Sequence, residues 1–191
     1  KDVNIDHAQD ATLYPESFPH FVRGRDSVRE YITKLCTSEI AVYNGAMGPM
    51  LEKSNFGEDD FRGEKFKDSS CNLKGNNDVL SLTQPSAVKG VYKEYLEGGS
   101  NLIGTNTFAS TGIALAEYGM ESCVYELNYE SARLAREVCD ELTAKDPTKP
   151  RFVVGAIGPT NRTGSISPSV EDPAARNVTF DELVESYFEQ I

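Results

Sequence analysis

The sequence has few of the residues from which metal sites and nucleophilic sites are usually built. Its 191 residues include no tryptophan, two histidines and four cysteines, and no two cysteines have Cys-x-x-Cys spacing. The histidines, His7 and His20, are far from every cysteine in the sequence. A zinc site within this chain is therefore not expected. We expect free thiols, most of them buried, in a reducing compartment. The cysteines are Cys36, Cys71, Cys123 and Cys139.

Positive charge and long apolar runs are also scarce. Lys and Arg number 19 against 30 Asp and Glu, which gives a formal net charge of -11. This excess of negative charge argues against nucleic acid or an anionic membrane surface as a partner. No run approaches the roughly 20 apolar residues of a membrane span. The first residues, Lys-Asp-Val-Asn-Ile-Asp, do not resemble a signal peptide. We expect a cytoplasmic protein.

Three short apolar segments are typical of β-strands. They are residues 40–43, 101–105 and 151–157, and the third is rich in β-branched residues and is expected to be buried. None of them leads into Gly-x-Gly-x-x-Gly, so a dinucleotide-binding fold has little support.

Helical periodicity separates these strands. Apolar residues recur at helical spacing over 26–36, from Pro85 to a Gly-Gly stop at 98–99, and over 124–142 before two prolines. Thr179 and Glu182 form a capping-box pattern, which predicts that a helix begins near Phe180. The alternation of strands and helices predicts an α/β fold with parallel strands, either a barrel or a doubly wound sheet.

The chain divides into an extension, residues 1–38, that is irregular apart from a short helix, and a domain, residues 39–191. Residues 51–82 form a long charged connection, whose charges we expect to lie on a solvated face or to cap helices.

The candidate site lies where the three strands end, because parallel α/β folds gather function at the carboxyl ends of their strands. The residues there are small, polar or glycine, and suit hydrogen bonds to a small zwitterion or carboxylate. No nucleophile is paired with a base, so no catalytic residue and no metal ligand is assigned. By composition alone, polar turns and a small-molecule pocket are equally good interpretations. The candidate residues are Asn44, Gly45, Thr105, Asn106, Thr107, Phe108, Gly158, Pro159 and Thr160.

Several motifs over residues 39–191 resemble the cobalamin-dependent methionine synthases, in the amino-terminal homocysteine-binding part of those enzymes. The long Gly-Pro-Thr-Asn-Arg-Thr to Ser-Pro stretch, residues 158–168, is the most specific. The others are Asn-Gly-Ala-Met-Gly-Pro-Met (44–50), Asp-Phe-Arg-Gly-Glu (60–64), Leu-Lys-Gly-Asn-Asn-Asp (73–78), Leu-Thr-Gln-Pro (82–85) and Thr-Asn-Thr-Phe (105–108).

The resemblance implies about three βα units of an eight-stranded (β/α)8 TIM barrel, incomplete in this chain. It implies methyl transfer from methylcobalamin, recharged by methyltetrahydrofolate, to zinc-activated homocysteine, which gives methionine. Zinc and cobalamin would then be held outside residues 1–191, as would the folate and cobalamin modules. We expect this chain to be a fragment that contributes pocket loops and is inactive alone.

Three positions depart from the family pattern. Asn44 stands where the family usually has Asp, Pro49 where it has Thr, and Gly104 where methionine synthases usually have Glu. A neutral amide at position 44 can accept a hydrogen bond from an ammonium group but lacks the negative charge of Asp. The loss of that charge is expected to weaken binding by about 1 to 2 kcal/mol.

Two other interpretations stay open. The same barrel could use betaine or S-methylmethionine as the methyl donor. The chain could also be a degenerate or regulatory product without catalysis, an interpretation that the residues at positions 44 and 104 favour.

Overall fold

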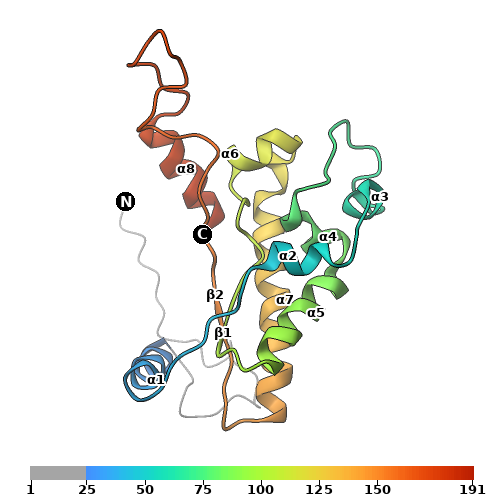
Figure 1. Ribbon diagram of the computed structural model, residues 1–191, viewed down its shortest axis with the longest axis vertical. Helices are drawn as coiled ribbons and strands as arrows, with labels where there is room; N and C mark the ends of the chain where they lie inside the picture. Colours follow the sequence, from blue (N-terminus) through green and yellow to red (C-terminus); the bar gives the residue numbers. More distant parts are fainter. Residues whose placement is uncertain (1–24) are drawn as a thin grey trace.

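A small parallel sheet lies at the centre of the protein (Figure 1). The computed structural model describes residues 25–191. Strands β1, Leu102–Gly104, and β2, Phe152–Val154, pair in parallel with Leu102 opposite Phe152. The segment before Asn44 runs parallel to β1 on its other side, joined by a bridge between Tyr43 and Leu102. The α/β class and the parallel direction of the strands are confirmed.

The strands are shorter than the sequence predicts. The first segment makes a single bridge instead of a strand over 40–43, and Ile40 is 89% exposed. The third strand ends at Val154, and Ile157 is 58% exposed, so the prediction of a buried strand over 151–157 is wrong in extent. Both segments lie at an outer edge of the described sheet, where no further strand covers their side chains.

Two long helices cover one face of the sheet. They are α5, Pro85–Glu97, and α7, Val124–Lys145, and both confirm the predicted periodicity. Pro85 begins α5, since proline has no N–H to lose in a first turn. After α5 the chain turns through Gly99, which has a positive φ of 111°. The buried side chain of Ile103 joins the core that these helices form, and this packing fixes where β1 ends.

The segment between the first strand and α5 is largely structural. It contains α2, Met47–Glu52; α3, Glu58–Arg62; a 3₁₀ turn η3, Asn77–Val79; and α4, Leu80–Thr83. It adds Leu51, Phe61, Leu73, Val79 and Leu80 to the core.

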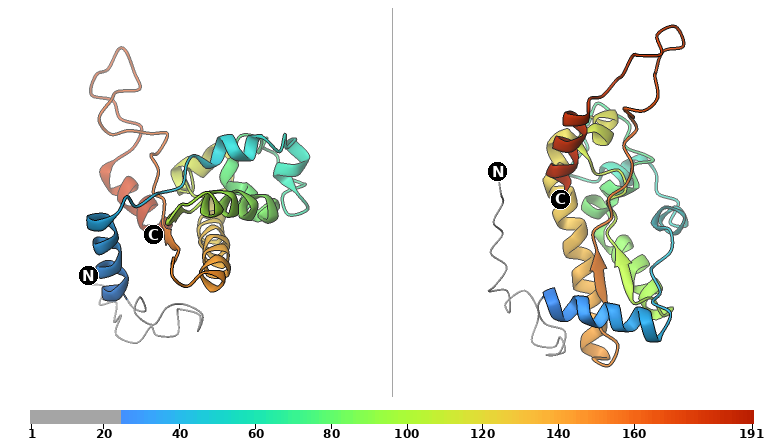
Figure 2. Two further views of the ribbon diagram at one scale, coloured as in Figure 1. Left: turned by 60° about the horizontal axis from the view of Figure 1, so that its bottom comes forward. Right: turned by 90° about the vertical axis from the view of Figure 1, so that its left-hand side faces the viewer.

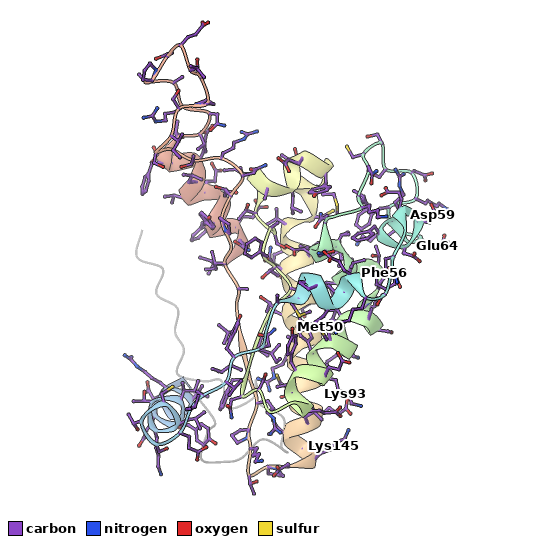
Figure 3. All side chains as sticks on the ribbon, in the orientation of Figure 1. Met50, Phe56, Asp59, Glu64, Lys93 and Lys145 are labelled. Carbon is purple, nitrogen blue, oxygen red and sulfur yellow. The ribbon has the colours of Figure 1, made fainter. Side chains whose placement is uncertain are left out.

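Some charges of this segment make internal contacts. The Glu58 carboxylate accepts the N–H groups of Leu73 and Lys74, and the side chain of Arg62 bonds it as well. Other charges are peripheral as expected: Figure 3 shows Asp59 and Glu64 at the rim of the molecule, whereas Met50 and Phe56 lie against the helical layer.

Four short or terminal helices complete the carboxyl end of the sheet. They are α6, Gly112–Leu115; the 3₁₀ turns η4, Ala116–Tyr118, and η5, Glu121–Cys123; and α8, Phe180–Gln190. The capping box at α8 is confirmed: the Glu182 N–H donates to Thr179 Oγ1 at 3.2 Å, and the Thr179 N–H donates to the Glu182 carboxylate at 2.7 Å. Helix α8 packs beside α6 and α7 (Figure 1).

Helix α1, Arg25–Ser38, crosses the amino-terminal ends of the strands (Figure 2). Its residues Val28, Tyr31 and Ile32 pack on Phe152, the first residue of β2, and Leu102 of β1 packs on Phe152 as well. The predicted short helix is confirmed. The division at residue 38 stays a prediction, and the two histidines lie outside the described residues.

All four cysteines are free, as expected, but only Cys139 is buried, so the expectation that most are buried is wrong. Cys36 is exposed on α1, Cys71 is half-buried between α3 and η3, and Cys123 is half-buried at the end of η5. No helix over residues 25–191 combines the length and the apolar character needed to cross a bilayer.

Candidate functional site

A cavity of about 430 Å³ opens at the carboxyl ends of the first extended segment and of β1. The structure brings six of the nine predicted site residues to its wall. The other three, Gly158, Pro159 and Thr160, do not line it. The six are Asn44, Gly45, Thr105, Asn106, Thr107 and Phe108.

The Asn44 side chain ties the two strand ends together. Its Oδ1 accepts the Gly104 N–H at 2.8 Å, and its Nδ2 donates to the Gly45 carbonyl at 3.1 Å. The residue is buried, so these two bonds satisfy groups that would otherwise lose water without compensation. In this geometry Asn44 shapes the cavity by fixing the backbone of Gly45 and Gly104.

Gly45 allows the close approach of a protein side chain. A Cβ at this position would lie 2.8 Å from the Tyr95 hydroxyl oxygen. That hydroxyl donates to the Ala46 carbonyl at 2.9 Å, so Tyr95 on α5 braces the first turn. The group that approaches Gly45 is therefore a protein side chain, that of Tyr95.

The turn after β1 is fixed from the helical side by Asn106. Its backbone N–H donates to the buried Tyr92 hydroxyl at 2.8 Å. Its Nδ2 donates to the Asn77 carbonyl at 2.8 Å and to Ser81 Oγ at 3.2 Å. Because these partners lie on α5 and around η3 and α4, helices far apart in sequence set the position of this turn.

Thr105 and Thr107 join the ends of β1 and β2. Thr105 Oγ1 accepts the Ala156 N–H at 2.9 Å, and Thr107 Oγ1 donates to the Ala156 carbonyl at 2.8 Å. The two hydroxyl oxygens are 2.6 Å apart. The hydroxyl that donates to Ala156 can accept from its neighbour, so the four groups form one connected network.

Asp78 also lines the cavity, and the sequence analysis did not assign it to the site. Its Oδ2 accepts the Ala109 N–H at 2.6 Å and the Ser110 hydroxyl at 2.8 Å. Burial raises the pKa of this carboxyl to about 6, against the hydrogen bonds from residues 108–110 that favour its charged form. The signals in the sequence were an acid that follows two asparagines, a pattern typical of turns, and its place in the Leu-Lys-Gly-Asn-Asn-Asp motif of the family resemblance.

The loop after β2 contacts the β1 turn at Phe108 but does not line the cavity. A Cβ at Gly158 would overlap the Phe108 carbonyl oxygen, so only glycine fits where the two turns touch. The Tyr187 hydroxyl of α8 donates to the Gly158 carbonyl at 2.9 Å. Pro159 is exposed, and Thr160 Oγ1 donates to the Arg162 carbonyl within the loop.

No metal site is formed by the part of the chain that the structure describes. Residues 25–191 contain no group of three or more His, Cys, Asp or Glu side chains that could hold a metal ion. The residues of this site therefore do not fit zinc, and we assign them no role in holding it or cobalamin.

The cavity wall is mostly neutral and mixes amide and hydroxyl side chains with apolar residues and glycines, and Asp78 and Tyr43 are its titratable groups. Amides, hydroxyls and backbone groups of this kind orient a small polar ligand by hydrogen bonds. The wall does not pair a nucleophile with a base, so its chemistry is binding and positioning.

Comparison with known proteins identifies the chain. Residues 41–191 match the profile of the homocysteine S-methyltransferase family, and they include all nine predicted site residues. The chain belongs to the homocysteine S-methyltransferase family.

Solved structures are similar to the same region. The metallated form of the homocysteine methyltransferase MmuM from Escherichia coli superposes with a TM-score of 0.51 and 22% identity over 67% of this chain. The oxidised form of that protein gives a TM-score of 0.52 at 22% identity over 67% of this chain. This chain covers 41% and 40% of those two chains, which is less than half of their length.

Proposed function

We propose that the protein is a homocysteine S-methyltransferase of the cobalamin-dependent methionine synthase type. In this proposal the homocysteine thiol takes a methyl group from methylcobalamin, which methyltetrahydrofolate recharges, and the product is methionine. The observation that carries the proposal is the cavity at the strand ends, whose wall includes six predicted site residues within the region that matches the family.

The three parallel segments would be the first of an eight-stranded barrel, and the cavity would lie at its carboxyl-terminal face. In this proposal the protein acts in the cytoplasm, together with folate-binding and cobalamin-binding modules. When bound, zinc would lower the pKa of the homocysteine thiol and deprotonate it. A free thiol, with a pKa near 8.5, is mostly protonated at neutral pH.

The residues described here would position the amino-acid end of homocysteine. The β1 turn is held by Tyr92, Asp78 and the Thr105–Thr107 pair before any ligand arrives. Such pre-organisation lowers the entropy lost on binding and keeps the substrate in one orientation.

The proposal is tested by an activity assay on the protein made from its complete coding sequence. Homocysteine is supplied with one methyl donor at a time: methylcobalamin with methyltetrahydrofolate, betaine, or S-methylmethionine. Methionine formed only with the cobalamin pair supports the proposal. Methionine formed with betaine or S-methylmethionine alone would assign another donor to the same barrel. No methionine with any donor would favour a product without catalysis.

A further inference from the structure

The side chain of Tyr43 occupies the space that a side chain at position 104 would need. A Cβ built on Gly104 overlaps the Tyr43 hydroxyl oxygen and lies 2.8 Å from Tyr43 Cζ. Real Cβ atoms do not approach other atoms this closely. The glycine at the end of β1 and the tyrosine at the end of the first segment therefore form one structural unit.

Strand geometry explains why the two residues meet. Tyr43 pairs with Leu102, and side chains two residues apart lie on the same face of a strand, so Tyr43 and Gly104 share the face that Leu102 occupies. This face is opposite the one that Ile103 buries against the helices. Helix α1 covers the amino-terminal end of this face by packing on Phe152, which pairs with Leu102. At its carboxyl end the Tyr43 ring lies over Gly104, at the wall of the 430 Å³ cavity.

The Tyr43 hydroxyl differs from most polar groups of that wall because its hydrogen-bonding capacity is unused. The side-chain donors of Asn44, Asn106 and Thr107 bond backbone carbonyls. Over residues 25–191 the Tyr43 hydroxyl makes no hydrogen bond, although the ring is about half exposed, at 49%. Burial raises the pKa of Tyr43 above its usual range, so the phenol is neutral at physiological pH and can donate its proton.

We propose that Tyr43 is a substrate-contacting residue that sets specificity, with its hydroxyl donating a hydrogen bond to the carboxylate of the amino-acid substrate. Gly104 is the position that admits the tyrosine ring. This inference rests on the proposed function, because it takes homocysteine as the ligand. A hydrogen bond from a neutral donor to a carboxylate is charge-assisted and stronger than one between neutral groups.

The test is calorimetric binding to the complete protein with two ligands, homocysteine and 3-aminopropane-1-thiol, which lacks the carboxylate. We expect Tyr43→Phe to weaken homocysteine binding about tenfold and to leave binding of the decarboxylated thiol within about twofold. Tyr95→Phe is the matched control. Its hydroxyl braces the turn at Ala46, so its loss is expected to affect both ligands by the same factor.

A second variant tests the role of the glycine. Gly104→Ala is expected to displace the Tyr43 ring and to weaken homocysteine binding at least tenfold. Adding Tyr43→Phe to Gly104→Ala is expected to bring less than a twofold further loss, because both changes remove the same contact. Circular dichroism melts of each variant show whether it is folded.

The outcomes separate the two proposals. Unchanged homocysteine binding by folded Tyr43→Phe, or an equal loss for both ligands, would overturn the role of Tyr43 and leave the proposed function standing. Failure of the unmutated protein to bind homocysteine would overturn both.

Discussion

Two neighbouring turns, one after β1 and one after β2, leave the sheet at the same edge but are built differently. The first, residues 105–110, is buried apart from Phe108 and Ala109 and bonds side chains from α5, α4 and the η3 turn. The second, residues 158–178, projects from the molecule (Figure 1), and its hydrogen bonds run mostly within the loop. The first turn is held by hydrogen bonds to side chains of the core helices, and the second mainly by hydrogen bonds within its own loop.

The difference shows which part of the site is formed before a ligand binds. The β1 turn cannot move without breaking buried hydrogen bonds, each of which costs on the order of 1 to 3 kcal/mol when a partner is left unsatisfied. Beyond Gly158 the β2 loop has few contacts with the core, so its conformation depends on its own short polar bonds. Regions with few buried contacts open at low free-energy cost.

The largest effect is expected at Asp78, which anchors the β1 turn. Asp78→Ala leaves the Ala109 N–H and the Ser110 hydroxyl without their buried acceptor and is expected to lower the free energy of unfolding by about 3 kcal/mol. Urea denaturation at pH 7 measures the change. Asp172→Ala, in the β2 loop, is the matched control and is expected to change stability by less than about 0.5 kcal/mol. Equal losses would contradict the difference between the turns.

Asp78 also predicts a pH dependence. Its pKa in the folded protein, about 6, lies above the ordinary value of 3.8, so the folded state binds the proton more tightly than the unfolded state. The proton-linked part of its contribution to stability is therefore greatest below pH 3.8 and is lost as the pH rises through 6, whereas its hydrogen bonds to residues 109 and 110 are also made at pH 7. Tyr92 and Tyr118, which face it, do not titrate in this range.

The variant Asp78→Asn isolates this contribution because it cannot titrate. Between pH 4 and pH 7, the stability of the unmutated protein relative to Asp78→Asn is expected to fall by roughly 2 kcal/mol. Urea denaturation across the pH range measures it. A difference that stays constant with pH would mean that Asp78 has an ordinary pKa.

The next largest effect is expected where the two turns touch. Gly158→Ala drives a methyl group into the Phe108 carbonyl oxygen and is expected to cost about 2 kcal/mol, because backbone must shift to accept it. Gly164→Ala is the control within the same loop, since no atom lies within 4 Å of a Cβ there. Thermal unfolding compares them. A neutral Gly158→Ala would show that the turns are not in fixed contact.

The smallest effect is expected at the end of the β2 loop, where α8 begins. Thr179→Ala removes the hydroxyl that caps the Glu182 N–H and is expected to cost about 1 kcal/mol. Thr163→Ala, which removes only a bond to Ser165 within the loop, is expected to be neutral within about 0.5 kcal/mol. A larger loss for Thr163→Ala, measured by urea denaturation, would contradict the self-contained nature of the loop.

Local chemistry made the four longest helices predictable. The Thr179 and Glu182 capping box, Pro85 at the start of α5 and the apolar stripe of α7 depend on neighbours in sequence, and the structure confirms each of them. The extent of the strands was harder to predict. Whether residues 155–157 extend a strand depends on a partner strand, and periodicity carries no information about partners.

The location of the site could be predicted from the sequence, but the contacts between its side chains could not. The strand-end rule located six residues of the cavity wall. No local pattern indicated that Asp78 would reach residues 109 and 110, about thirty positions away, or that Tyr43 would fill the space over Gly104. Both contacts arise from tertiary packing between elements that are distant in the chain.

The most direct test of the account is a crystal structure of the complete protein with homocysteine bound. We predict density for the amino acid in the 430 Å³ cavity, with its carboxylate within hydrogen-bond distance of the Tyr43 hydroxyl. A second cavity of about 610 Å³ lies between β2, α7 and α8, lined in part by Tyr125 and Tyr129. Homocysteine bound there, with the first cavity empty, would contradict the account.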